Sequence, residues 1–177
     1  IMAGIIKVNQ YQDFNGNTIL TSDGSGKLTT QEILYPAFEA QLTSTQSLSD
    51  LVYTKVQFDD EIFDTDNCYD NSTNYRFTPT VAGKYFIYTN VCGDPLSPSQ
   101  IEEIRGNIYK NGSSVRSNVV NYSENDIRLS TVSTQAVLDM NGSTDYVESY
   151  IRLNDTSGSP QVYGLNNETY FGAYRIG

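Results

Sequence analysis

The residues with the most evident chemical potential are six carboxylates within twelve positions, from Asp59 to Asp70. Carboxylates at this density are ligands that Ca²⁺ prefers. Their spacing departs from the EF-hand pattern, because Cys68 stands where a third ligand is required and Tyr69 where glycine is required. We therefore predict a solvated loop. The alternative is a calcium site built from Asp59, Asp64, Asp66 and Asp70.

Other catalytic chemistries have little support in the sequence. The chain has no histidine, which excludes within it a histidine general base, a Ser-His-Asp triad and His-ligated zinc. Cys68 and Cys92 are the only cysteines, and we interpret them as reduced and buried, with one disulfide as the alternative. The 21 acidic residues leave a glycosidase-type carboxylate pair open by number, but no motif singles one out. We predict no enzymatic activity and no cofactor other than the calcium alternative.

The charge balance limits the choice of partners. Eleven basic residues against 21 acidic residues give a net charge of −10 at pH 7. A negative field of this size repels phosphate backbones, so we expect no nucleic-acid partner. No apolar run approaches 18 residues, so we expect no membrane insertion. The opening IMAGIIKVNQ lacks the long apolar region of a secretory signal.

The segments that position these residues have the sequence pattern of β-strands. Short apolar runs divided by turn residues recur from Pro36 onwards, and residues 127–140 and 146–153 alternate clearly between apolar and polar. Asn111-Gly112 is a hairpin signal. The pattern predicts an all-β sandwich or barrel over residues 36–177. Only the segment Pro98–Arg105 has the composition of a short surface helix or a loop.

The first 35 residues differ from the rest of the chain. They hold two short apolar patches around a hairpin signal at Asn15-Gly16 and a flexible stretch at residues 23–26. This is too little apolar material to bury a core, so we predict an N-terminal arm, residues 1–35, that docks on another surface. A free tail is the alternative. The docking residues would be Ile5, Ile6, Val8, Ile19 and Leu20.

Six sequence blocks in residues 36–177 resemble the C1q-like domain of the C1q/tumour-necrosis-factor superfamily. The longest is Tyr75–Phe86, which is similar to the family signature Phe-x-x-Pro-x-x-Gly-x-Tyr-x-Phe. The block Leu138–Val147 resembles Leu-x-x-Gly-Asp-x-Val, with three extra residues between the leucine and the aspartate. The other four blocks are Pro36–Ala40, Val56–Asp59, Ile108–Gly112 and Thr169–Tyr174.

The resemblance implies a ten-stranded jelly-roll sandwich that forms a compact homotrimer. It implies that Tyr85 and Phe86 point to opposite faces of one strand, one into the core and the other towards a neighbouring copy, and that Tyr170 and Phe171 do the same. Gly83 would supply permissive backbone geometry, and Gly172 would leave room for close packing. The residues expected in the core or the trimer interface are Phe38, Phe58, Phe77, Pro79, Gly83, Tyr85, Phe86, Tyr170, Phe171 and Gly172.

The arm has a likeness of its own. Residues 4–10 and 13–20 resemble the N-termini of tail-fibre and other virion appendage proteins of marine bacteriophages. The resemblance implies a virion protein assembled in the bacterial host cytoplasm, a capsid decoration or tail-fibre head whose arm binds capsid or tail proteins. Its head would meet a glycan or protein of the host surface. The first alternative is a bacterial carbohydrate-binding, lectin-like module with the same head, and the second is a calcium-stabilised, cytokine-like ligand.

Overall fold

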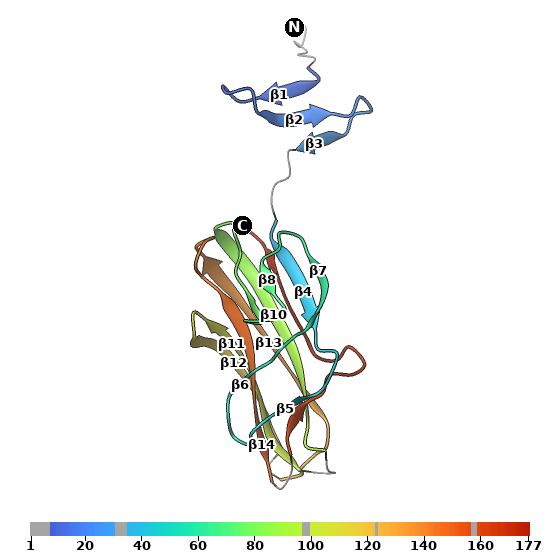
Figure 1. Cartoon of the computed structure of the whole chain (residues 1–177), viewed down its shortest axis with the longest axis vertical. Helices are drawn as coiled ribbons and strands as arrows, with labels where there is room; N and C mark the ends of the chain where they lie inside the picture. The colour runs from blue at the N-terminus through green and yellow to red at the C-terminus, as the bar shows by residue number, and fades with distance from the viewer. Residues whose placement is uncertain (1–7, 31–34, 97–99, 123, 157–158) are drawn as a thin grey trace, which may run out of the picture. The chain divides into compact units, whose positions relative to one another are not determined.

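The computed structural model describes residues 8–30, 35–96, 100–122, 124–156 and 159–177. The chain divides into two compact units, Ile1–Leu34 and Tyr35–Gly177, which we call the arm and the head (Figure 1). Ile5 and Ile6, two of the residues predicted to dock the arm, lie outside the described ranges. Within those ranges, no helical segment has the length and apolar character needed to cross a bilayer.

The arm is a small antiparallel sheet in the order β1-β2-β3. Its strands are β1 (Gln10–Gln12), β2 (Thr18–Ser22) and β3 (Leu28–Thr30). Each connecting turn is closed by one aspartate. The Asp13 carboxylate accepts hydrogen bonds from the backbone N–H groups of Asn15 and Asn17, and Asp23 binds those of Ser25 and Lys27 in the same way. These local bonds define the strand ends in a unit that has almost no interior.

The first sheet of the head has seven strands in the order β5-β15-β10-β16-β4-β7, with β13 on the other side of β10. β10 is the central strand, because it pairs with β13 along one side and with β15 and β16 along the other. All of these pairs are antiparallel. The strands are β4 (Ala37–Gln41), β5 (Gln46–Ser47), β7 (Asp60–Asp64), β10 (Gly83–Asp94), β13 (Ser130–Met140), β15 (Gln161–Val162) and β16 (Tyr170–Arg175).

The second sheet has six strands in the order β12-β11-β14-β9-β8, with β6 also paired to β14. β11 and β12 form a hairpin whose turn, Asn111-Gly112, has positive φ at both positions, as its sequence predicts. The strands are β6 (Thr54–Lys55), β8 (Tyr69–Asp70), β9 (Arg76–Phe77), β11 (Ile101–Lys110), β12 (Ser113–Asn121) and β14 (Val147–Asp155).

The two sheets form an all-β, jelly-roll-like sandwich, which confirms the predicted fold class. The described part of the head has thirteen strand segments, where ten strands were expected. The difference arises because some positions in the sandwich are filled by two short segments. For example, β15 and β16 both pair with β10, and β6 and β9 both pair with β14.

An aromatic cluster fills the space between the sheets. The Phe38 ring stacks on those of Tyr69 and Phe77, with centroids 4.5 and 4.7 Å apart, and meets Phe171 edge-on at 5.0 Å. Alternation along each strand sends these rings inwards. Full burial of one such side chain contributes about 1.5–3 kcal/mol, so the cluster is a main source of stability in a chain without tryptophan.

The structure differs from the prediction in the segment Pro98–Arg105. Residues 97–99 lie outside the described ranges, but β11 begins at Ile101, where a short helix or a loop was expected. A register irregularity between Ile101 and Glu103 interrupts the alternation of inward and outward side chains in this strand. The consecutive acidic residues Glu102 and Glu103 therefore hide the period of two that predicts a strand. Pairing with β14 decides the conformation of this segment.

Candidate functional site

Four aromatic side chains line the outer face of the first sheet, on its two central strands. Phe86 and Tyr88 lie on β10, and Tyr170 and Tyr174 lie on β16. The ring centroid of Phe86 lies 5.9 Å from that of Tyr88 and 5.5 Å from that of Tyr174. The ring centroids of Tyr88 and Tyr170 are 6.3 Å apart. The rings therefore form one continuous group, which we call the aromatic face.

Neighbouring residues hold Tyr88 in place. Gly172 lies directly opposite it on β16, and a Cβ atom at that position would overlap the Tyr88 ring. The Tyr88 hydroxyl donates a 2.7 Å hydrogen bond to Oε2 of Glu39. Burial, followed by the Glu39 carboxylate, raises the pKa of Tyr88 above its usual value, so the phenol remains a donor at neutral pH.

The aromatic face is open to solvent in the single chain. Val137, opposite Phe86 on β13, is 50% exposed, and Tyr174 is 47% exposed. A hollow of about 270 Å³ lies between the rings and β13. Contiguous apolar surface of this kind marks an interaction site more often than a solvated face. Its chemistry is apolar burial with hydroxyl groups that can hydrogen-bond.

The predicted signature residues divide among three places and do not form one site. Phe86, Tyr170 and Gly172 belong to the aromatic face. Gly83 and Pro79 shape the entry into β10, and Gly83 has a φ of 154°, where a Cβ would overlap the carbonyl oxygen of Gly177. The remaining five lie in the core with no exposed surface: Phe38, Phe58, Phe77, Tyr85 and Phe171.

Sequence reasoning missed two members of the aromatic face, Tyr88 and Tyr174. The signal was present, because each lies on the same strand face as a predicted residue, Tyr88 two positions after Phe86 and Tyr174 four after Tyr170. The contribution of Val137 could not be found in this way. It depends on the pairing of β13 with β10.

The acidic segment does not form a metal site within one chain. Asp59 accepts bonds from the backbone N–H and hydroxyl groups of Thr43, Asp64 accepts the backbone N–H of Tyr69, and Asp66 binds the Thr80 hydroxyl. Asp70 closes the turn that follows it. No group of three or more histidine, cysteine, aspartate or glutamate residues in the described ranges could hold a metal ion. The four calcium candidates therefore act separately, because each carboxylate bonds to a different residue: Thr43, Tyr69, Thr80 or Thr73.

Asp70 illustrates this capping role. Its carboxylate accepts the backbone N–H groups of Ser72, Thr73 and Asn74 at 3.1, 2.8 and 3.1 Å, and the Asn74 side-chain amide at 2.7 Å. The bond from Thr73 is the main cause that lowers the pKa of Asp70 far below its ordinary value of 3.8. Nearby Glu61 shows the opposite effect: burial and the charges of Asp64, Asp60 and Asp70 raise its pKa.

Both cysteines are free and buried, as the sequence predicts. The Cys68 thiol lies 3.7 Å from Oδ1 of Asp64, and the Cys92 thiol lies 3.4 Å from Oε2 of Glu168. Burial, with these carboxylates, raises the pKa of both thiols, that of Cys92 to about 12. A thiol held protonated is a poor nucleophile and a poor metal ligand, so neither cysteine supports catalysis.

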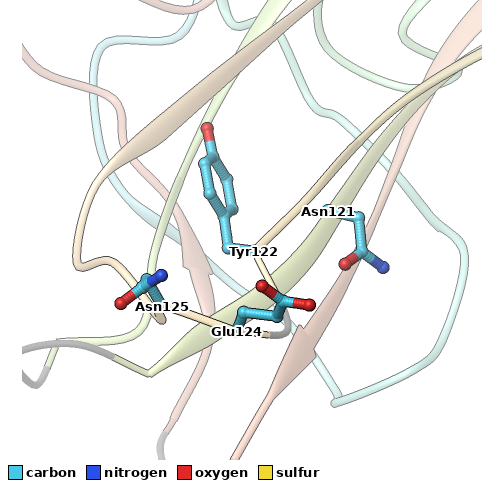
Figure 2. Close-up of a pocket in the computed structure, with 4 residues that line it drawn as sticks. All are labelled: Asn121, Tyr122, Glu124 and Asn125. Atoms are coloured by element: carbon cyan, nitrogen blue, oxygen red, sulfur yellow. The ribbon is translucent and has the colours of Figure 1, made fainter.

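One further pocket, of about 360 Å³, lies at the loop after β12 (Figure 2). The Tyr122 ring points away from the polar ends of Asn121, Glu124 and Asn125, and those ends do not converge on one point (Figure 2). The Tyr122 hydroxyl lies 3.0 Å from the Ser130 hydroxyl. The backbone N–H of Tyr122 donates a 2.6 Å hydrogen bond to the carbonyl of Glu102. Tyr122 therefore supports the loop, and the pocket offers no pair of catalytic groups.

The head is similar to known proteins in both sequence and structure. The C1q domain model matches residues 37–174. Among solved structures, murine APRIL at pH 5.0 superposes with a TM-score of 0.59 at 11% identity, over 81% of this chain and 100% of that chain. The globular domain of zebrafish complement 1qA superposes with a TM-score of 0.53 at 17% identity, over 80% and 98%.

These structural likenesses establish the fold alone, because the identities are low. No curated protein sequence matches this chain with significance. The family model covers the six sequence blocks except Pro36, and the strands of both sheets except Arg175 at the end of β16. The chain belongs to the C1q domain family.

Proposed function

We propose that this protein is a non-enzymatic binding and structural module whose head assembles into a homotrimer through the aromatic face. The observation that carries the proposal is the exposure of Val137 and Tyr174 beside Phe86 and Tyr88, on the central strands of the first sheet. Burial of these side chains against neighbouring copies supplies a driving force without a covalent link. The family resemblance supports three copies per assembly.

The arm has a different role in this proposal, as an anchor. Val8 and Ile19 are 48% and 51% exposed in their own unit, and Phe14, at the tip of the first hairpin, is fully exposed. A sheet of three short strands with so little buried surface gains stability from a partner surface. We propose that this partner is a capsid or tail protein of a phage virion, on the basis of the arm's likeness to appendage N-termini. The head would then face the host surface.

The mass of the protein in solution tests the trimer. Light scattering on the full chain is expected to give about three times the 19.7 kDa chain mass. Val137→Glu places a charge on the aromatic face without disturbing the core, because Val137 is half exposed, and it is expected to yield a folded monomer. Val119→Glu, at a 43% exposed valine on β12 of the second sheet, is the matched control and should leave the trimer intact.

A monomeric full chain would overturn the trimer. If Val119→Glu dissociated the assembly and Val137→Glu did not, the interface would belong to the second sheet. Circular dichroism on both variants separates dissociation from unfolding.

A further inference from the structure

The outer face of the second sheet carries an unusual pairing of like charges. Arg105 on β11 lies directly opposite Arg152 on β14 in the antiparallel ladder. Like charges in opposed positions destabilise a sheet. The chain has only 11 basic residues and a net charge of −10, so two arginines in register are not a result of abundance. A surface arrangement that lowers the stability of a sheet is commonly found at a functional site.

One carboxylate holds the two arginines together. Glu103 accepts bonds from Nε and Nη2 of Arg105 at 2.6 and 2.9 Å, and from Nη1 of Arg152 at 2.5 Å. Two guanidinium groups share one carboxylate, so the cluster retains one positive charge. The arginine side chains are 34% and 22% exposed, whereas Glu103 is 13% exposed. The excess charge therefore faces solvent while its anchor is largely covered.

Tyrosines surround this charge. The guanidinium carbon of Arg152 lies 5.9 Å from the centroid of Tyr53, a ring that is 41% exposed. Further along the same two strands, Tyr109 and Tyr150 stack with centroids 4.1 Å apart. The sheet thus presents flat aromatic surface beside a fixed cation, with phenol hydroxyls at its margin.

The loop before β6 fixes Tyr53 relative to Arg152. Leu51 donates its backbone N–H to the carbonyl of Leu153 at 2.8 Å, and its own carbonyl accepts Nε of Arg152 at 3.2 Å. Leu51 has a φ of 60°, a conformation that costs a bulky residue free energy and persists only where surrounding contacts enforce it. The tyrosine and the arginines are therefore positioned before any ligand arrives.

We propose that Arg105, Arg152 and Tyr53 form a binding site for a carboxylated saccharide. A carboxylate complements the one uncompensated charge of the cluster, and it can accept hydrogen bonds from the guanidinium N–H groups that are not bonded to Glu103 or Leu51. The open tyrosine ring offers an apolar surface to the C–H face of a sugar ring, and Glu103 and the phenols offer hydrogen-bond partners to its hydroxyls.

This proposal deepens the proposed function by naming the ligand class of the head, and it is tested independently of the trimer. The probes are trigalacturonate, a mannuronate trimer and sialyllactose, each titrated calorimetrically into the full-length protein. The fully methyl-esterified trigalacturonate has the same rings without charge. At least one carboxylated probe is expected to bind, and esterification of trigalacturonate is expected to weaken its binding at least tenfold.

Variants assign the binding to the cluster. Arg152→Gln and Tyr53→Ala are each expected to weaken binding of the best probe at least tenfold. Lys84→Gln is the matched control, because Lys84 is 58% exposed on the first sheet and pairs with Asp139, so its loss changes the net charge equally. It should leave the affinity within twofold. Thermal unfolding of each variant verifies the fold, and Tyr53→Ala leaves the bonds of Glu103 to both arginines in place.

Three outcomes overturn the proposal. The first is that no carboxylated probe binds to the wild-type protein. The second is equal binding of the ester, or equal weakening by Lys84→Gln, which would show that the cluster does not recognise the carboxylate. The third is equally tight binding of triglutamate, which would assign the face to acidic peptides. In each case the mass of the protein in solution still reports on the trimer, so the failure of one proposal is distinguishable from that of the other.

Discussion

Gly172 and Tyr88 show how a single position controls the aromatic face. The two residues are paired across β16 and β10, and the ring occupies the space that a side chain at 172 would need. The ring orientation in turn allows the hydrogen bond from Tyr88 to Glu39. The glycine is therefore required by close approach, as the family resemblance implies, and only the register of the two strands identifies Tyr88 as the approaching residue.

We predict that Gly172→Ala destabilises the head by about 1–3 kcal/mol, because the added methyl group forces the Tyr88 ring from its position. It is also expected to weaken self-association, since the displaced ring belongs to the aromatic face. Urea unfolding followed by circular dichroism gives the first quantity, and the dissociation constant from sedimentation gives the second. Gly177→Ala is the control, because a Cβ there meets no atom within 4 Å. Equal effects of both changes would contradict the steric argument.

At the scale of elements, the turn between β8 and β9 depends on one carboxylate. Asp70 binds three backbone N–H groups in succession and thereby joins two strands of two residues each. Strands this short have little cooperative pairing of their own. The Asp70 carboxylate fixes the turn that the short strand pairing does not fix by itself. In this part of the acidic segment, a carboxylate that suggests a calcium ligand therefore has a structural role.

The lowered pKa of Asp70 predicts a stability that depends on acid. Because the folded state holds the carboxylate ionised, its contribution is present above the ordinary value of 3.8 and is lost as pH falls below it. Asp70→Asn is expected to cost about 1–2 kcal/mol at pH 7 and to flatten the decline between pH 4 and pH 2.5. Urea unfolding across this range tests it. Asp139→Asn, at a side chain that is 78% exposed, should change neither result; an unchanged acid profile in Asp70→Asn would refute the assignment.

At the scale of the whole molecule, the arm and the head are separate units with separate sources of stability. The head buries an aromatic core and a long central strand, whereas the arm relies on local turns. A unit without an interior contributes little to the cooperative unfolding of its neighbour. In the proposed function, its exposed apolar residues would gain stabilisation from the surface that the arm binds.

We predict that removing residues 2–34 leaves the melting temperature of the head within 2 °C and its mass in solution at three head units. The same deletion is expected to abolish incorporation into virions, measured by immunoblotting of purified particles. Tyr11→Ser with Ile19→Ser, which keeps the arm's length but removes two exposed apolar side chains, should reduce incorporation as well. Normal incorporation of the deleted protein would show that the head, and not the arm, contacts the particle.

The sequence by itself determined the all-β class and the hairpin at Asn111-Gly112, and it predicted that Tyr85 and Phe86, like Tyr170 and Phe171, point to opposite faces of their strand. These follow from the period of two along a strand and from backbone preferences of single residues, which are local properties. The start of β11, the pairing of Val137 with Phe86 and the opposition of Arg105 and Arg152 were decided only by the tertiary structure. So was the separation of the four aspartates that resembled a calcium site. The physical reason is that strand register joins residues far apart in the chain, and outside a tight hairpin the local pattern of one sequence does not specify which residues will be opposed.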